Sequence, residues 1–257
     1  MAARSSALSL VEVERRESVY NALLVRRRGA WTDLDVAGAT FASHHATHLL
    51  TGYSWDALFA GTLLGARPPA RVLVLGLGGG TCVRPLLRAV DGVHVTGVEL
   101  DKDVIELSRA HLGLDTEAID VVIGDADRYV STTHARFDAI VDDLFLSGVD
   151  DVHRAGAAFD ARLTRLHALL NEGGVVVANF ITDGAHAATY RDGRRAFTRT
   201  FDVVKVVKPP RGLNAILVGG TRVAGKRAIT SVRGRFESAH DRARLDELTV
   251  RRVARPD

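Results

Sequence analysis

The strongest constraint on the fold is a short apolar run that is followed at once by a glycine-rich loop. Residues 71–75 (Arg-Val-Leu-Val-Leu) are typical of a strand covered on both faces. Residues 76–80 (Gly-Leu-Gly-Gly-Gly) follow, and the next residues, about 82–89, have a helical pattern. Glycines at a strand end allow a tight turn and close approach of a ligand to the backbone. We expect an adenosine-bearing cofactor here; the alternative is a plain strand-to-helix turn.

Strands and helices alternate after the loop, which predicts a doubly wound, mostly parallel, Rossmann-like α/β sheet of seven strands. The expected strands are 71–75, 93–98, 121–123, 139–141 and 175–179, with a closing hairpin of 203–207 and 215–218. The expected helices are 53–64, 82–89, 103–111, 157–170 and 191–200.

The first fifty residues have a different pattern. Residues 8–15, 20–26 and 31–36 tend to alternate apolar and polar side chains and are punctuated by glycine, which predicts a small antiparallel β-element. We therefore expect three parts: an N-terminal β-element (1–50), a cofactor-binding α/β domain (51–225) and a basic C-terminal extension (226–257).

Composition excludes several classes of protein. The single cysteine, Cys82, excludes a disulfide framework and a multi-cysteine zinc site, and we expect it to be a packing residue. No apolar stretch approaches the roughly 20 residues that span a bilayer, and residues 1–9 lack the apolar core of a signal peptide, so we expect a cytoplasmic protein without a membrane span.

The net charge is +3, and much of the basic excess lies in the C-terminal extension. Such a segment can bind nucleic acid or an acidic partner. Acidic residues are interspersed in it and no aromatic side chains interleave for base stacking, which favours a solvated, arginine-rich helix and tail without nucleic acid.

Polar residues close the next two expected strands. Glu99 lies about 20 residues beyond the loop, where an acidic residue accepts hydrogen bonds from ribose hydroxyls. Asp125 follows the third strand, where its carboxylate can accept a bond from an adenine amino group and the Ala126 N–H can meet the ring. The alternatives are a solvated strand-end carboxylate at Glu99 and a simple turn at Asp125.

Asp142 and Asp143 close the fourth expected strand. Paired carboxylates beside a bound cofactor are candidates for general-base catalysis or for holding a cationic group. We expect one to face the cofactor and the other to turn aside; the alternative is a pair that begins a loop or caps a turn.

Other side chains are weaker candidates. His44 and His48 have the i, i+4 spacing of a helical metal pair, but no carboxylate-rich motif accompanies them, so we expect no metal and place them on the substrate side. Trp55 and Phe59 are expected in the core rather than beside a substrate. Residues 180–184, past the fifth strand, are expected to contribute to an acceptor pocket.

Together these motifs resemble class I S-adenosylmethionine-dependent transferases, and more narrowly the spermidine synthase (polyamine aminopropyltransferase) family. The similarity covers about residues 8–220. Residues 17–25 (Glu-Ser-Val-Tyr-Asn-Ala-Leu-Leu-Val) resemble the family's Ser-x-Tyr-x-x-Ile-x-Val strand, and residues 35–43 resemble the strand that follows it.

The resemblance implies roles for individual residues and a homo-oligomer, a dimer or tetramer, built partly through the β-element. Asp143 would be the catalytic aspartate that deprotonates the attacking amine, and Asp142 and Tyr53 would lie on the substrate side. The residues implied to hold the cofactor are Gly76, Gly78 and Gly80 at its methionine part, Glu99 at the ribose, and Asp125 with Ala126 at the adenine.

One departure from the family's loop, Gly-Gly-Gly-Asp-Gly-Gly, affects the expected reaction. Gly79 stands where the family has an aspartate that contacts the aminopropyl end of the decarboxylated cofactor. We therefore expect methyl transfer from S-adenosylmethionine to a small molecule. The alternatives are aminopropyl transfer from decarboxylated S-adenosylmethionine to a polyamine, and a non-catalytic relative that binds the cofactor or a partner.

Overall fold

Alternate residues of the central strand face two separate hydrophobic cores. The computed structural model describes residues 9–115, 117–147, 152–154 and 159–255. In β5 (Arg71–Leu75), Val72 and Val74 belong to one core, whereas Leu73 and Leu75 belong to the other. A strand that is apolar on both sides must be covered on both sides, so the sequence pattern of this run dictates a layered α/β arrangement.

The main sheet has eight strands, five of which are mutually parallel. The other three add to one side of it in antiparallel pairs. In spatial order the strands are β14 (Thr249–Arg252), β12 (Val203–Lys208), β13 (Asn214–Gly220), β11 (Leu170–Ile181), β8 (Phe137–Asp142), β5, β6 (His94–Glu99) and β7 (Ile119–Ile123).

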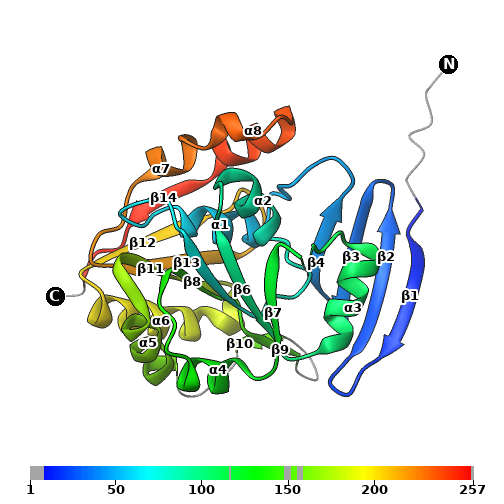
Figure 1. Ribbon diagram of the computed structural model, residues 1–257, viewed down its shortest axis with the longest axis horizontal. Coiled ribbons are helices and arrows are strands. Elements are labelled where there is room, and N and C mark those ends of the chain that lie inside the picture. The colour runs from blue at the N-terminus through cyan, green and yellow to red at the C-terminus, as the bar shows by residue number, and fades with distance from the viewer. Residues whose placement is uncertain (1–8, 116, 148–151, 155–158, 256–257) are drawn as a thin grey trace.

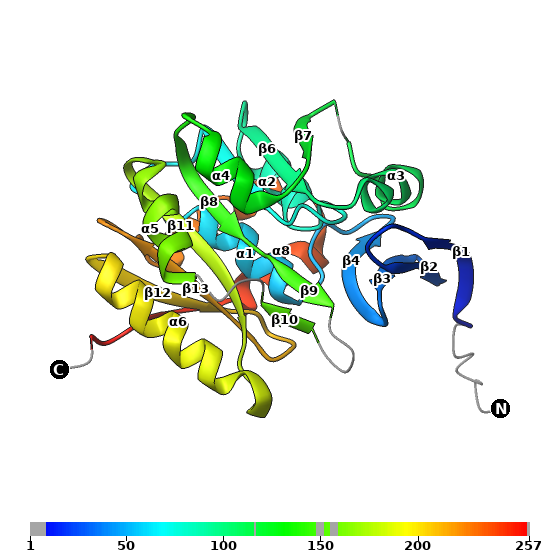
Figure 2. The ribbon, with the colours of Figure 1, turned by 90° about the horizontal axis from the view of Figure 1, so that it is seen from below.

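Helices cover both faces of this sheet (Figures 1 and 2). One core contains side chains of α1 (Ser54–Thr62), α2 (Val83–Ala89), α7 (Lys226–Thr230) and α8 (Ala239–Glu247). The other core contains side chains of α4 (Ala126–Thr132), α5 (Phe159–Ala168) and α6 (Ala187–Thr200). This arrangement confirms the doubly wound α/β class.

The direction of the chain reverses at β5. The chain runs from β5 through β6 to β7 on one side, and then returns to place β8 on the other side of β5. Ligands of open α/β sheets bind at such a switch point, outside the carboxyl ends of the strands. The glycine loop leaves β5 at this point.

A second, four-stranded antiparallel sheet precedes the α/β part. Its strands are β1 (Val11–Glu17), β2 (Ala22–Arg28), β3 (Trp31–Val36) and β4 (Ala39–His45), in that spatial order. One face packs on α3 (Lys102–His111), and Leu23, Leu34 and Leu107 are fully buried between them. The small N-terminal antiparallel β-element is thus present, with a fourth strand at 39–45.

Several elements of the structure were not predicted from the sequence. The eighth strand of the main sheet, β14, comes from the C-terminal residues, which also supply the buried side chains of Ile229, Phe236 and Leu245. These residues pack into the core rather than forming only a solvated helix and tail. Helix α4, the 3-10 turns at Gly184–His186 and Arg233–Arg235, and the short pair β9 (Phe145–Ser147) and β10 (Val152–Arg154) were also not expected. Residues 157–158, expected in α5, lie outside the described part.

The antiparallel hairpin of β12 and β13 is confirmed. Within the described ranges, no helix combines the length and the apolar character needed to cross a membrane.

Candidate active site

A cleft of about 1320 Å³ lies where the carboxyl ends of the parallel strands meet the N-terminal sheet. It is lined from the sheet edge by strand-end residues such as Gly76, Glu99 and Asp143, and from the N-terminal sheet by residues such as Trp31 and Phe41. Two parts of the chain therefore form one cavity, and the site depends on how the N-terminal sheet is attached.

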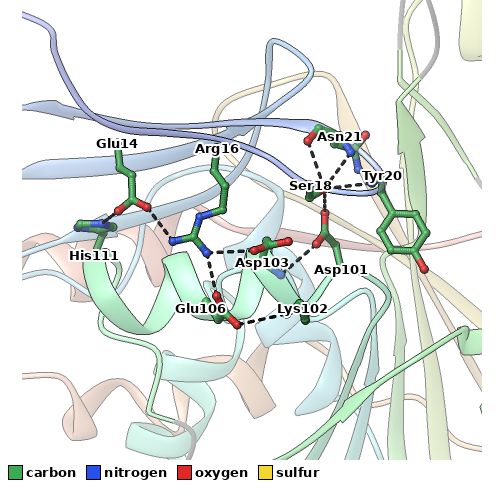
Figure 3. Close-up of polar contacts among 10 residues, drawn as sticks. All are labelled: Glu14, Arg16, Ser18, Tyr20, Asn21, Asp101, Lys102, Asp103, Glu106 and His111. Atoms are coloured by element: carbon green, nitrogen blue, oxygen red, sulfur yellow. Dashed lines mark hydrogen bonds and ion pairs between the residues drawn. The ribbon is translucent and has the colours of Figure 1, made fainter.

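Polar contacts with α3 hold the N-terminal sheet in place (Figure 3). The Arg16 guanidinium lies 3.0 Å from the Asp103 carboxylate. The Ser18 hydroxyl contacts the carboxylate of Asp101, which also accepts the Asp103 N–H at the start of α3. The backbone N–H of Tyr20 bonds to the same Ser18 hydroxyl. These contacts fix the β1–β2 turn beside the strand end of β6, and Tyr20 lines the cleft.

The glycine loop contributes two of its three predicted residues to the cleft. Gly76 and Gly78 line it with φ angles of +78° and +52°, which favour glycine. A Cβ atom at Gly78 would have only the Phe41 carbonyl oxygen nearby, at 3.5 Å, so the loop leaves room for a ligand there. Gly80 does not line the cleft; its carbonyl accepts the Val83 N–H at 2.9 Å where α2 begins.

Glu99 ties the second strand to this loop. One carboxylate oxygen, Oε2, accepts the Gly78 N–H at 2.9 Å, and Oε1 accepts the Asp101 N–H at 3.1 Å. Burial raises the pKa of Glu99 above its ordinary value, and the backbone N–H donors oppose that rise. A carboxylate held in this way at the cleft wall is suited to accept hydrogen bonds from ribose hydroxyls.

Asp125 and Ala126 also line the cleft, at the end of β7. Asp125 caps α4, and its Oδ1 accepts the Arg128 N–H at 2.7 Å. Asp125 was predicted to meet the adenine, and its capping role was not predicted. The neighbouring Gly124 N–H bonds to the Glu99 carbonyl at 2.8 Å, which brings the two strand ends together.

Asp142 and Asp143 lie on different sides of the strand end. Asp143 lines the cleft, and its Oδ1 accepts the Asn179 amide N–H at 2.8 Å. Asp142 is fully buried, does not line the cleft, and has Oδ2 3.9 Å from the Arg162 guanidinium. Of the two, Asp143 alone lines the cleft, whereas Asp142 was also expected on the substrate side.

A side chain at position 79 would point away from the cleft. A Cβ atom at this position would overlap the Cβ of Ala42 in β4 and would lie 3.2 Å from Leu112 Cδ2 after α3. A side chain here would be directed into the packed contact between the glycine loop and the N-terminal sheet. In this chain, the absence of an aspartate at position 79 therefore says little about what the cleft binds.

Aromatic side chains also line the cleft. Tyr53, the predicted substrate-side tyrosine, lines it and is 46% exposed. Trp55 both packs against a core and lines the cleft, whereas Phe59 is fully buried. Ile181 and Asp183 line the same region, within the stretch expected for an acceptor pocket.

The rings of three histidines form a stack. The rings of His45 and His48 are 4.2 Å apart, and those of His48 and His240 are 4.4 Å apart. His44 instead contacts Arg84. No group of metal-binding side chains was found among the described residues.

The cleft-lining residues that were not predicted from the sequence include Arg26, Asn179, Arg211 and Asn214. Asn179 and Asn214 lie on neighbouring antiparallel strands, a pairing that no local pattern specifies. The sequence could have indicated Asn179 and Asn214 only through their positions at the ends of predicted strands.

The fold and the cleft define a Rossmann-like domain with a cleft at its switch point, outside the carboxyl ends of the parallel strands. The family model of the spermine/spermidine synthase domain matches residues 58–208. Since this match covers more than half of the sequence, the chain belongs to the spermine/spermidine synthase family, which confirms the resemblance.

Individual relatives agree with the family. The chain is 33% identical over 159 residues to polyamine aminopropyltransferase 2 of Hyperthermus butylicus, a match covering 58% of this chain and 51% of the relative. The chain thus spans about half the length of the curated relatives it matches.

Two solved structures share the fold. A probable spermidine synthase from Corynebacterium glutamicum superposes with a TM-score of 0.71 at 18% identity, over 93% of this chain and 90% of the other. Human methyltransferase-like protein 13 superposes with a TM-score of 0.60 at 19% identity, over 71% and 90%. At these identities the likeness establishes the fold alone.

Proposed function

We propose that this protein transfers an aminopropyl group from decarboxylated S-adenosylmethionine to a small amine of the polyamine class. The observation that carries the proposal is the Asp143 carboxylate in the cleft beside the glycine loop. Its position next to Gly76 is fixed by backbone contact, because the Asp143 N–H bonds to the Leu75 carbonyl at 3.0 Å.

The residues present fit an adenosine-type sulfonium cofactor. Glu99 offers acceptors for ribose hydroxyls, Asp125 offers an acceptor for an adenine amino group, and the open backbone at Gly78 leaves room for close approach. Gly76 and Ala126 complete this wall of the cleft. The bound cofactor supplies an electrophilic carbon next to sulfur, at which a C–N bond forms as the C–S bond breaks.

The chain's own residues serve the acceptor. Asp143 accepts the proton that the attacking nitrogen releases, or holds its ammonium form before attack. Tyr53 and Asp183 lie at the acceptor end, where an aromatic ring and a carboxylate suit a hydrocarbon chain that carries cationic nitrogens. Positioning of the two reactants supplies much of the rate in such a displacement.

The expected preference for methyl transfer loses its main support. That preference depended on the view that Gly79 replaces a carboxylate in the cleft. A side chain at position 79 would instead be directed at Ala42. The similarity to polyamine aminopropyltransferase 2 of Hyperthermus butylicus supports the aminopropyl alternative instead.

One observation keeps methyl transfer to a small molecule as a second candidate. Arg211 lines the same cleft, and a cation there opposes a di- or tricationic acceptor. Arg26 also lines the cleft, but its charge is paired with Asp35. The third alternative is a non-catalytic protein that binds the cofactor, and it predicts cofactor binding without turnover.

We also propose a cytoplasmic homo-oligomer, a dimer or tetramer, in which residues 1–50 contribute to assembly and residues 51–225 hold the reaction. The exposed edge strand β1 supports this proposal, since Val11 and the preceding Leu10 are 53% and 54% exposed. We propose that residues 226–257 do not bind nucleic acid, because several of their arginines pair with acidic groups, as Arg233 does with Asp246.

Calorimetry with S-adenosylmethionine, its decarboxylated form and methylthioadenosine tests the proposal. We expect the decarboxylated form to bind more tightly than S-adenosylmethionine. The opposite preference would favour methyl transfer, and no binding by any of the three would contradict the proposed cofactor.

A further inference from the structure

Asn179 makes a directed contact with the proposed base. It lies near the carboxyl end of β11, is only 4% exposed, and lines the cleft. Its side-chain nitrogen Nδ2 donates to Asp143 Oδ1 at 2.8 Å. A nearly buried amide that donates to a carboxylate favours the charged form of that carboxylate and limits its rotation.

Asn214 determines which way the Asn179 amide faces. It begins β13, the antiparallel neighbour of β11, in register with Ile181. Its Nδ2 donates to Asn179 Oδ1 at 2.9 Å. An asparagine side chain carries a donor group and an acceptor group that exchange places when the amide rotates by a half turn. With Oδ1 engaged by Asn214, the NH₂ group of Asn179 must face Asp143.

We propose that Asn179 and Asn214 form a two-residue positioning relay for Asp143. Asn214 sets the orientation of the Asn179 amide, and Asn179 holds the Asp143 carboxylate toward the acceptor. Rotation of the Asn179 amide would present an oxygen to the carboxylate and lose both bonds; without Asn214, only the bond to Asp143 opposes that rotation. The catalytic consequence of the relay rests on the proposed role of Asp143 as base or ammonium anchor.

The chain contains a matched control at the opposite end of the same strands. Asn171 Nδ2 donates to Asp138 Oδ1 at 3.0 Å, also between β11 and β8, but neither residue lines the cleft. Asn171→Leu removes an asparagine–aspartate bond of the same type without touching the site. Asn179→Leu and Asn214→Leu are the test variants.

Two measurements on the full chain test the relay. The first is a ¹³C NMR titration of aspartate carboxyl groups, with Asp143→Asn to assign the Asp143 signal. We expect the pKa of Asp143 to rise by about one pH unit in Asn179→Leu, by less in Asn214→Leu, and not in Asn171→Leu. An Asp143 titration in Asn179→Leu that coincides with that of the parent would overturn the proposal.

The second measurement is steady-state turnover of decarboxylated S-adenosylmethionine with 1,4-diaminobutane, together with the cofactor Kd. We expect kcat to fall by about tenfold or more in Asn179→Leu while the cofactor Kd changes by less than about threefold. An unchanged kcat would remove the catalytic part of the proposal. If the parent protein itself forms no aminopropyl product, the proposed function fails, and the titration still decides whether the relay exists.

Discussion

Asp142 and Asp143 are adjacent in the chain, yet their carboxylates serve different parts of the molecule. Asp142 is fully buried near Arg162, whose guanidinium also makes paired bonds of 2.6 and 2.9 Å with Asp127. Asp143 faces the cleft and accepts from Asn179. This division separates a carboxylate that holds β8, α4 and α5 together from one that lines the cleft.

Replacement of each aspartate by asparagine should therefore have a different effect. We expect Asp143→Asn to lower turnover by about 10²–10⁴-fold and to leave the cofactor Kd within about threefold. We expect Asp142→Asn to lower the free energy of unfolding by about 2–4 kcal/mol, because it leaves the buried Arg162 with less compensating charge. Kinetics and urea denaturation of both variants check this. Unchanged turnover in Asp143→Asn would exclude the assigned role and favour a non-catalytic protein.

Cofactor affinity should depend on the charge of Glu99. Glu99→Gln replaces one acceptor oxygen with a donor, and we expect the cofactor Kd to rise about 10–100-fold. Burial raises the pKa of Glu99, so protonation begins at a higher pH than for an ordinary glutamate, and the Kd of the parent should rise as the pH falls through that pKa. Calorimetry between pH 4.5 and 8 checks both effects. Asp120→Asn, at an exposed position on β7, is the control. An unchanged cofactor affinity in Glu99→Gln would contradict the assignment of Glu99 to the ribose.

Gly79→Asp should damage the fold rather than create a new cofactor contact. Its Cβ would overlap Ala42, and its carboxylate would be directed into the contact with the N-terminal sheet. We expect a loss of about 2–4 kcal/mol in the free energy of unfolding. Gly234→Asp is the control, since a Cβ there meets nothing within 4 Å. A fully stable Gly79→Asp with tighter binding of the decarboxylated cofactor would contradict this view of the loop.

His44 should make stability depend on pH. Burial, assisted by Arg84 and His45, lowers the pKa of His44 to about 4, whereas an unfolded histidine titrates near 6.5. Between these values the unfolded chain binds a proton that the folded protein excludes, so the free energy of unfolding falls as the pH drops from about 6.5 to 4. Because the ring is only partly buried, we expect His44 to contribute about 1–2 kcal/mol of this fall.

Denaturation of His44→Gln at several pH values tests this contribution. We expect a smaller loss of stability on acidification in this variant than in the parent, with the exposed His134→Gln as the matched control. Burial raises the pKa of Asp56 to about 6, so Asp56 makes the free energy of unfolding rise as the pH falls, opposite to His44. The test therefore compares variants rather than the shape of one curve. An equal loss in His44→Gln and the parent would contradict the assignment.

The α/β fold and much of the cleft were predictable because they depend on local patterns. A two-sided apolar strand such as β5 requires layers on both faces, and strand-end residues such as Glu99 meet at one sheet edge whatever the loops do. The direction of a side chain beyond that edge was not predictable. The burial of Asp142, the contact of Gly79 with Ala42 and the pairing of Asn179 with Asn214 each depend on a distant part of the chain.

The central claim is tested most directly by the nucleoside that the protein releases. The purified protein is incubated with 1,4-diaminobutane and either decarboxylated S-adenosylmethionine or S-adenosylmethionine, and the products are identified by mass spectrometry. Asp143→Asn serves as the control for turnover at this site. We predict methylthioadenosine and an aminopropylated amine from the decarboxylated cofactor. S-adenosylhomocysteine and a methylated acceptor formed from S-adenosylmethionine, with no methylthioadenosine, would contradict the account.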